Sequence, residues 1–369
     1  MNNHDYKQTA YYLIYLIKCI LNHKIPSNEK LDEIDLSQLY EVAQKHSLTA
    51  MVAFALESAG IQDERFLQAK SKSIQRTLYF KIERTAVLLA LEKSEIWYMP
   101  LKGIIISELY PKVSMREMAD NDILFDSSRV DDIKQIMNNR GFIMEQDDSG
   151  HDLVFMKKPV YNFEMHTNLF GIGHDEKFNQ YYENVKDRLI KDSTSNFGFH
   201  FSVEDFYIFM IAHEYKHFYQ GGTGLRSLVD TYIYINQYGE ALNRKYIDAE
   251  LNKLGIKEYE NKSRNLALAL FNGICLSDDE KTLLDYYIFS GTYGNIDNLI
   301  KNKLNKDNVN KAQYAIRRLF LPMEMIREHY PLFYNHPILI PLLPLYRIIT
   351  HTSLKRIINE FKTLIKLQP

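Results

Sequence analysis

The stretch that decides the fold runs from Trp97 to Phe125 and reads WYMPLKGIIISELYPKVSMREMADNDILF. Its first five residues form a short apolar run, and Pro100 disfavours a helix at the residue before it. Lys102-Gly103 then opens an amphipathic segment that continues to Tyr110. The last part, from Asp120 to Phe125, places two carboxylates in alternation and then becomes apolar, which is typical of a strand. The stretch therefore predicts a strand, a tight turn, a helix and a second strand.

The residues that follow extend this unit. Asp126 and the serines after it can cap a helix that runs to about Asn139, and Gly141 is a typical glycine stop. Three short runs then predict further strands, at Phe142 to Glu145, Leu153 to Lys157 and Tyr161 to His166. Together these elements predict a small mixed α/β unit.

Both flanks of this unit have helical patterning. Apolar residues recur at helical spacing from Tyr6 to about Ile96, and the same pattern returns at Val203 and continues almost to the last residue. We therefore expect an α+β protein, in which a small mixed-sheet core is flanked by an N-terminal helical section and a larger C-terminal helical domain. The expected limits are 1–96, 97–200 and 201–369.

Composition narrows the class of protein. The chain has 369 residues, of which 46% are apolar and 25% charged, and this excludes a mainly disordered protein. A net charge of -2 leaves no global field to hold a nucleic acid backbone. Cys19 and Cys275 lie far apart and indicate neither a disulfide framework nor a cysteine zinc site. The longest apolar run, Pro337 to Tyr346, falls short of the roughly 20 residues that span a bilayer. We expect a cytoplasmic protein without a transmembrane segment.

Carboxylates are the most informative side chains of the predicted sheet. Because side chains on a strand alternate between faces, Asp120 and Asp122 project to one side while Asn121 points to the other. The same alternation places Glu164 on one face with His166. If these strands are neighbours, three acidic groups converge. Such a cluster is unfavourable without a proton or a cation, and hard oxygen ligands select Mg²⁺ or Mn²⁺.

Three carboxylates with two metal ions suit phosphoryl transfer, which also requires cations to hold phosphate. Lys102 and Gly103 lie at a strand-to-helix turn, where backbone amides can receive a phosphate, and Arg116 precedes the acidic pair. Each feature alone has an ordinary explanation, because an Asp-x-Asp pair is often a solvated turn and single cations often form surface pairs. The pattern as a whole favours a metal-dependent reaction on a polyphosphate.

The motifs resemble the uncharacterised nucleotidyltransferase family of bacteria, which belongs to the polymerase-β-like superfamily. The likeness spans about Trp97 to Asp230 and is weaker outside. The segments that carry it are Pro100-Leu-Lys-Gly103, Glu108-Leu-Tyr110, Arg116, Asp120-Asn-Asp-Ile-Leu-Phe125, Arg140-Gly-Phe142, Phe163-Glu-Met-His166, His213, His217, Gly221 to Gly224 and Leu225-Arg-Ser-Leu-Val-Asp230.

The resemblance implies a role for each matching residue. Asp120 and Asp122 would be metal ligands, and Glu164 would be the third carboxylate. Gly103 would form the nucleotide-binding turn, and Lys102, Arg116 and Arg226 would bind phosphate. His166, His213, His217 and Asp230 would line or support the cleft. For Arg226 and Asp230, four residues apart on one helix, an ion pair with each other is the open alternative.

A competing motif is His213-Glu214-Tyr-Lys-His217, the His-Glu-x-x-His pattern of zinc hydrolases. Two histidines one helical turn apart would bind zinc, and the glutamate would activate water. The third ligand of the extended form of this motif is missing, because Gln220 stands where that pattern needs glycine. Zinc hydrolysis therefore stays open as the first alternative, and a non-catalytic nucleotide-binding protein as the second.

The main hypothesis is a magnesium- or manganese-dependent nucleotidyltransferase. It would move a nucleoside monophosphate from a nucleoside triphosphate (NTP) to an acceptor hydroxyl and release pyrophosphate by a two-metal mechanism. The sequence does not name the base or the acceptor, which could be a protein, a sugar, a small metabolite or an RNA end.

Overall fold

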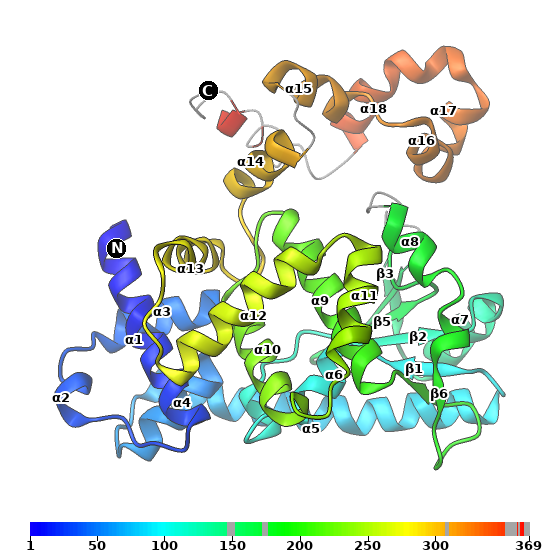
Figure 1. The fold of residues 1–369 in the computed structure, drawn as a ribbon. Helices are drawn as coiled ribbons and strands as arrows, with labels where there is room; N and C mark the ends of the chain where they lie inside the picture. Colours follow the sequence, from blue (N-terminus) through cyan, green and yellow to red (C-terminus); the bar gives the residue numbers. More distant parts are fainter. Residues whose placement is uncertain (146–151, 172–175, 307–309, 351–359, 361, 365–369) are drawn as a thin grey trace.

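The structure is a computed structural model, and it describes residues 1–145, 152–171, 176–306, 310–350, 360 and 362–364. The chain opens with five helices, as the helical spacing predicts: α1 (Asn3–Leu21), α2 (Asn28–Leu31), α3 (Leu36–Lys45), α4 (Thr49–Ser58) and α5 (Glu64–Lys93). Side-chain caps begin three of them, because Asn2, Asp35 and Asp63 each accept a hydrogen bond from an amide of the first turn. Figure 1 shows the long α5 lying beneath the sheet.

A five-stranded mixed sheet follows. Its elements are β1 (Tyr98–Pro100), α6 (Lys102–Ser107), the short 3-10 turn Val113–Met115, β2 (Asn121–Phe125), the 3-10 turn Ser127–Arg129, α7 (Val130–Asn139), β3 (Ile143–Glu145), β4 (Asp152–Lys157) and β5 (Tyr161–His166). The strand order is β1-β2-β5-β4-β3, in which only β2 and β5 run parallel. The predicted strands and the helix stop at Gly141 are confirmed, while the helix that begins at Lys102 ends earlier than expected.

One face of the sheet forms a compact hydrophobic core with α5 and α7. Ile123, Phe125 and Phe163 pack there against Val87 of α5 and Ile133 of α7. These strand residues alternate with the polar residues predicted to share the opposite face. The sheet therefore buries one side and presents its carboxylates on the other.

The opposite side of the sheet is covered by the C-terminal helices. These elements are α8 (Glu176–Tyr182), the 3-10 turn Val185–Arg188, β6 (Ile190–Lys191), β7 (Phe199–His200), α9 (Val203–Tyr219), α10 (Leu225–Tyr238), α11 (Arg244–Leu254), α12 (Lys257–Asn272) and α13 (Asp278–Ser290). Residues of α1, α3 and α4 share one hydrophobic core with α9, α10, α12 and α13. The two helical flanks, far apart in sequence, are thus joined in space, and the sheet is attached to their common body (Figure 1).

The last helices form small separate clusters. They are α14 (Ile296–Lys306), α15 (Lys311–Leu319), α16 (Met323–His329), α17 (Pro331–Asn335), the 3-10 segment Pro337–Leu342 and α18 (Leu343–Thr350). Their buried residues group apart from the main core, and Figure 1 shows them above the rest of the molecule. In the described part of the chain, no helix combines the length and the apolar character that crossing a membrane requires. The α+β class with a small mixed sheet is confirmed, and the three domain limits stay predictions.

Candidate active site

A cleft of about 340 Å³ lies between the polar face of the sheet and helices α9 and α10. All of the site residues that the nucleotidyltransferase hypothesis names line this cleft, although they come from distant parts of the chain. They are Lys102, Gly103, Arg116, Asp120, Asp122, Glu164, His166, His213, His217, Arg226 and Asp230. The sheet supplies the acidic wall and the helices supply most of the basic wall.

The acidic wall follows from strand register. β2 and β5 are neighbours, and their parallel pairing sets Asp122 directly beside Glu164. One ligand atom from each of Asp122, Glu164 and His166 lies within 4.8 Å of the others. Asn121 faces away, as expected from the alternation, because it is fully buried and accepts a hydrogen bond from Arg84 of α5 at 3.0 Å. Asp122, Glu164 and His166 therefore have the spacing of a metal-binding group.

His166 is held between two carboxylates. Its Nε2 lies 2.9 Å from Asp122 Oδ1 and its Nδ1 lies 2.6 Å from Asp152 Oδ1. Burial alone would lower the pKa of His166, but the hydrogen bonds to Asp122 and Asp152 more than offset it and raise this pKa to about 10. Both ring nitrogens therefore donate, and the imidazolium fixes the orientation of Asp122.

Asp152 is a site residue that the sequence reasoning missed. It pairs with His166 across the antiparallel β4 and β5. The signal was present in the hairpin register, because counting outward from the Lys157 and Tyr161 pair leads to Asp152 opposite His166.

Asp120 lies just before β2 and is outside the group of three atoms within 4.8 Å. It still interacts with that group. Burial, together with the negative charges of Asp122 and Glu164, raises the pKa of Asp120 to about 7. The three predicted carboxylates therefore interact electrostatically. The group within 4.8 Å consists of Asp122, Glu164 and His166, without Asp120.

Lys216 of α9 is the second residue that the sequence reasoning missed. Burial lowers its pKa, while the charges of Asp152, Asp122 and Glu164 raise it in part. The signal was helical spacing, because a residue three after His213 and one before His217 lies near the same face of a helix. Lys216 thus brings a positive charge to the acidic wall.

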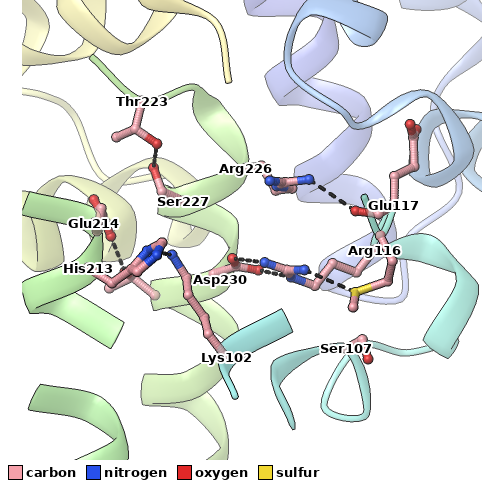
Figure 2. Close-up of polar contacts among 12 residues, drawn as sticks. Lys102, Ser107, Arg116, Glu117, His213, Glu214, Thr223, Arg226, Ser227 and Asp230 are labelled. Carbon is pink, nitrogen blue, oxygen red and sulfur yellow. Dashed lines mark hydrogen bonds and ion pairs between the residues drawn. The ribbon is translucent and has the colours of Figure 1, made fainter. Parts of the chain in front are cut away.

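The basic wall is organised around Asp230. Arg116 donates to it through Nε and Nη2, both at 2.9 Å (Figure 2). The Tyr110 hydroxyl also donates to Asp230, at 2.7 Å. Both charged side chains are buried, at 6% and 5% exposure. The ion pair of Asp230 is therefore with Arg116, and the simpler pairing with Arg226 on the same helix is wrong.

Arg226 has no such partner. Its Nη1 donates to the backbone carbonyl of Glu117 at 3.0 Å (Figure 2), and no carboxylate in the described ranges forms an ion pair with it. Burial and the nearby charge of Arg116 lower the pKa of the Arg226 guanidinium. A half-buried cation without a carboxylate partner is poised to receive an anion.

Lys102 contacts the histidine motif. Its Nζ lies 3.1 Å from His213 Nδ1 (Figure 2). Burial lowers the pKa of His213 well below its usual value, so this ring is neutral and accepts the bond. Burial likewise lowers the pKa of Lys102 to about 8. Gly103 beside it is buried, and a Cβ there would lie 3.0 Å from Met118 Cε and 3.3 Å from Arg116 Nη1. The Met118 and Arg116 side chains therefore pack closely against the Gly103 backbone.

The zinc motif does not assemble a zinc site. Glu214 points into the helical core, where it accepts hydrogen bonds from Tyr259 at 2.7 Å, Tyr287 at 2.9 Å and Ser263 at 3.2 Å. It is 2% exposed, so it cannot activate a water molecule in the cleft. Within the described residues, no third His, Cys, Asp or Glu joins His213 and His217. The two rings line the cleft with centroids 4.6 Å apart.

The acidic wall fits a hard divalent cation. Asp122 and Glu164 offer carboxylate oxygens, which suit Mg²⁺ and Mn²⁺. Burial and the like charges of Asp122 and Glu164 raise the pKa of Asp120, and a bound cation would relieve this repulsion. A carboxylate wall opposite unpaired cations is the arrangement expected of an enzyme that handles a polyphosphate through a metal ion.

Comparison with known proteins gives the family. The model of a family described as uncharacterised nucleotidyltransferase matches residues 32–272, well over half of the chain. The chain therefore belongs to the uncharacterised nucleotidyltransferase family, which confirms the family that the motifs indicated. The bacterial origin and the polymerase-β-like superfamily stay predictions. No curated protein and no solved structure matches it.

Proposed function

We propose that the cleft transfers a nucleoside monophosphate from an NTP to an acceptor hydroxyl. The observation that carries the proposal is the meeting of Asp122, Glu164 and His166 within 4.8 Å on one wall of a cleft whose other wall holds Arg226 and Lys102. Family membership supports the general nucleotidyltransferase role.

Each wall has a separate task in this proposal. Asp120, Asp122 and Glu164 hold the metal ions, and His166 keeps Asp122 in position through its bond to Asp152. When bound, Mg²⁺ would neutralise the triphosphate and stabilise the charge that develops on pyrophosphate. Arg226 and Lys102 hold phosphate oxygens, because neither cation is paired with a carboxylate in the described chain.

Arg116 takes a different part. Its guanidinium already donates two hydrogen bonds to Asp230. We therefore propose that Arg116 holds the residues of the basic wall in place and does not bind phosphate directly. Because Arg116 compensates the charge of Asp230, the positive charges of Arg226 and Lys102 remain available to attract the triphosphate.

In the transfer step, an acceptor oxygen forms a bond to the α-phosphorus and the bond from that phosphorus to the pyrophosphate oxygen breaks. The hydroxyl proton leaves to a carboxylate of the acidic wall. Glu164 is the candidate base, since Asp120 and Asp122 would both be engaged by the metal ions.

Magnesium-dependent NTP binding tests the metal part of the proposal. Each ribonucleoside triphosphate would be titrated into the protein by calorimetry, with and without Mg²⁺. We expect Asp122→Asn and Glu164→Gln to lose about tenfold or more in affinity in the presence of Mg²⁺, equivalent to about 1.4 kcal/mol or more, and Arg226→Met to lose affinity whether or not the ion is present.

Glu145→Gln is the matched control, since Glu145 is an exposed carboxylate on the edge strand β3 of the same sheet. It should leave NTP affinity unchanged. Equal affinity in Asp122→Asn, Glu164→Gln and the wild type would remove the carboxylate cluster from the site. Tight binding without any transfer to an acceptor would favour the non-catalytic nucleotide-binding alternative.

A further inference from the structure

A second cavity of about 500 Å³ adjoins the cleft. It lies at the end of α13 and is bordered by the first turn of α1, by Lys45 at the end of α3 and by the loop of residues 290–295. Thr292 and Tyr293 line both this cavity and the cleft. The two spaces therefore share one wall, and we call the second space the side pocket.

The cleft and the side pocket together have room for two substrates. Ligand pockets commonly measure about 300–1,000 Å³, so a cleft of about 340 Å³ lies at the lower end of that range. A nucleotide with its three phosphates fills such a space, and the transfer reaction needs a second molecule next to it. The side pocket is large enough and directly adjacent.

The side pocket is lined by aromatic rings and by one positively charged side chain, Lys45. Tyr6 and Phe289 stack with their ring centroids 5.7 Å apart. The ammonium of Lys45 lies 4.6 Å from the centroid of the Tyr6 ring, and no ion pair joins Lys45 to a carboxylate among the described residues. Rings offer a surface for another ring, and an unpaired lysine offers a site for an anion.

The shared wall carries an exposed ring on a fixed loop. Tyr293 is 84% exposed, yet its loop is held in place, because the Thr292 amide donates to the Lys45 carbonyl at 2.8 Å and the Asn295 amide donates to the Gly221 carbonyl at 2.8 Å. The Tyr293 ring is therefore available to a molecule bound at the junction of the side pocket and the cleft.

We infer that the side pocket is the acceptor subsite, and that the acceptor is a hydroxylated ring compound carrying an anionic group, such as a sugar phosphate. The inference rests on the proposed nucleotidyl transfer. The anion lies on Lys45 and the ring stacks on Tyr293 at the junction, which directs a hydroxyl of the ring toward the cleft.

A third cavity is less suited to this role. It measures about 270 Å³ and also borders the cleft, through Leu101 and Phe209. Its lining is mostly apolar, with Ile105 and Phe206 among its residues and no lysine or arginine. A charged, hydroxylated acceptor would lose its hydration there without compensation.

A tryptophan reporter tests the inference by binding alone. The chain has a single tryptophan, Trp97, so Trp97→Phe combined with Tyr293→Trp places the only indole at the shared wall. The probes are hexose and pentose phosphates, each compared with its neutral sugar. We expect saturable fluorescence changes with at least one sugar phosphate and weaker binding of the matching neutral sugar.

A substitution then locates the binding. Lys45→Gln, made in the reporter protein, should weaken sugar phosphate binding about tenfold, as expected for loss of a hydrogen bond to a charged group. Mg-ATP affinity of the otherwise wild-type protein should stay unchanged in Lys45→Gln, because Lys45 lines the side pocket and not the cleft. Tyr79→Ala is the control in both assays, because Tyr79 is an exposed tyrosine on α5.

Two results overturn the inference. One is that no sugar phosphate changes the reporter fluorescence. The other is that Lys45→Gln weakens Mg-ATP binding, which would make the side pocket part of the nucleotide site. Both results are independent of catalysis, so they are distinguishable from failure of the transfer reaction itself, which is measured by label transfer in the wild-type protein.

Discussion

The buried cluster of Tyr110, Arg116 and Asp230 supports both walls of the cleft, and its removal should be costly. In Asp230→Ala the Arg116 guanidinium loses its two bonds of 2.9 Å and the Tyr110 hydroxyl loses its bond of 2.7 Å. Leaving one charge of a buried ion pair uncompensated costs about 3–5 kcal/mol. We therefore expect the free energy of unfolding to fall by about 3–5 kcal/mol in Asp230→Ala.

A double substitution separates the loss of the ion pair from the loss of packing. Arg116→Met/Asp230→Leu removes both charges, so no buried charge is left without a partner. This variant should be more stable than Asp230→Ala, with a coupling energy between the two positions of about 2–3 kcal/mol.

Urea unfolding measures these differences. Far-ultraviolet circular dichroism would be followed together with the fluorescence of Trp97, which lies in the strand region and packs against Phe199 with ring centroids 6.2 Å apart. Coincident transitions by the two probes would justify a two-state treatment. A loss below about 1 kcal/mol in Asp230→Ala, or additive effects of the two positions, would refute the buried-cluster reasoning.

Three further predictions follow from individual groups. Burial lowers the pKa of Lys102 to about 8, so this lysine is charged and binds anions below that pH and loses its proton above it. NTP affinity, measured by calorimetry across pH, should therefore fall in the wild type as the pH rises through about 8. In Lys102→Met this fall should be absent. Glu214→Gln should lower the free energy of unfolding by about 1–3 kcal/mol through its buried hydrogen bonds without changing Mg-NTP affinity. Bound zinc that is lost in His217→Ala would instead favour the hydrolase alternative. Gly224→Ala should cost about 1–3 kcal/mol of stability in urea unfolding, because the added Cβ would lie 2.7 Å from His46 Nδ1 and 2.8 Å from the Thr292 amide; an unchanged midpoint would contradict that close packing.

The sheet and its polar face could be predicted from the sequence, because strand alternation determines which side chains share a face. Asp122 and Glu164 followed from that rule, and the resemblance supported their pairing across neighbouring strands. The partner of Asp230 could not be predicted in this way. Helical spacing offered Arg226, four residues away, but Arg116 approaches from a distant segment, and local periodicity contains no information about such tertiary contacts.

The histidine motif is a second case in which local spacing does not predict tertiary contacts. His213, Glu214 and His217 have the spacing of a zinc site, yet the glutamate lies on the side of α9 that packs against Tyr259 and Tyr287. A pattern in one helix cannot tell which side faces a cleft and which side is buried. The common core of the N- and C-terminal helices could not be predicted from periodicity either, because it joins α4, which ends at Ser58, to α9, which begins at Val203.

Transfer of the α-phosphate tests the central claim most directly. The protein would be incubated with Mg²⁺, a fractionated cell extract as the source of acceptor, and NTP labelled at either the α- or the γ-phosphate. The account predicts that the α-label passes to an acceptor while the γ-label is released as pyrophosphate, and that both events disappear in Asp122→Asn and persist in Glu145→Gln. Release of the γ-label as free phosphate without transfer of the α-label, or transfer that is equal in Asp122→Asn and the wild type, would contradict it.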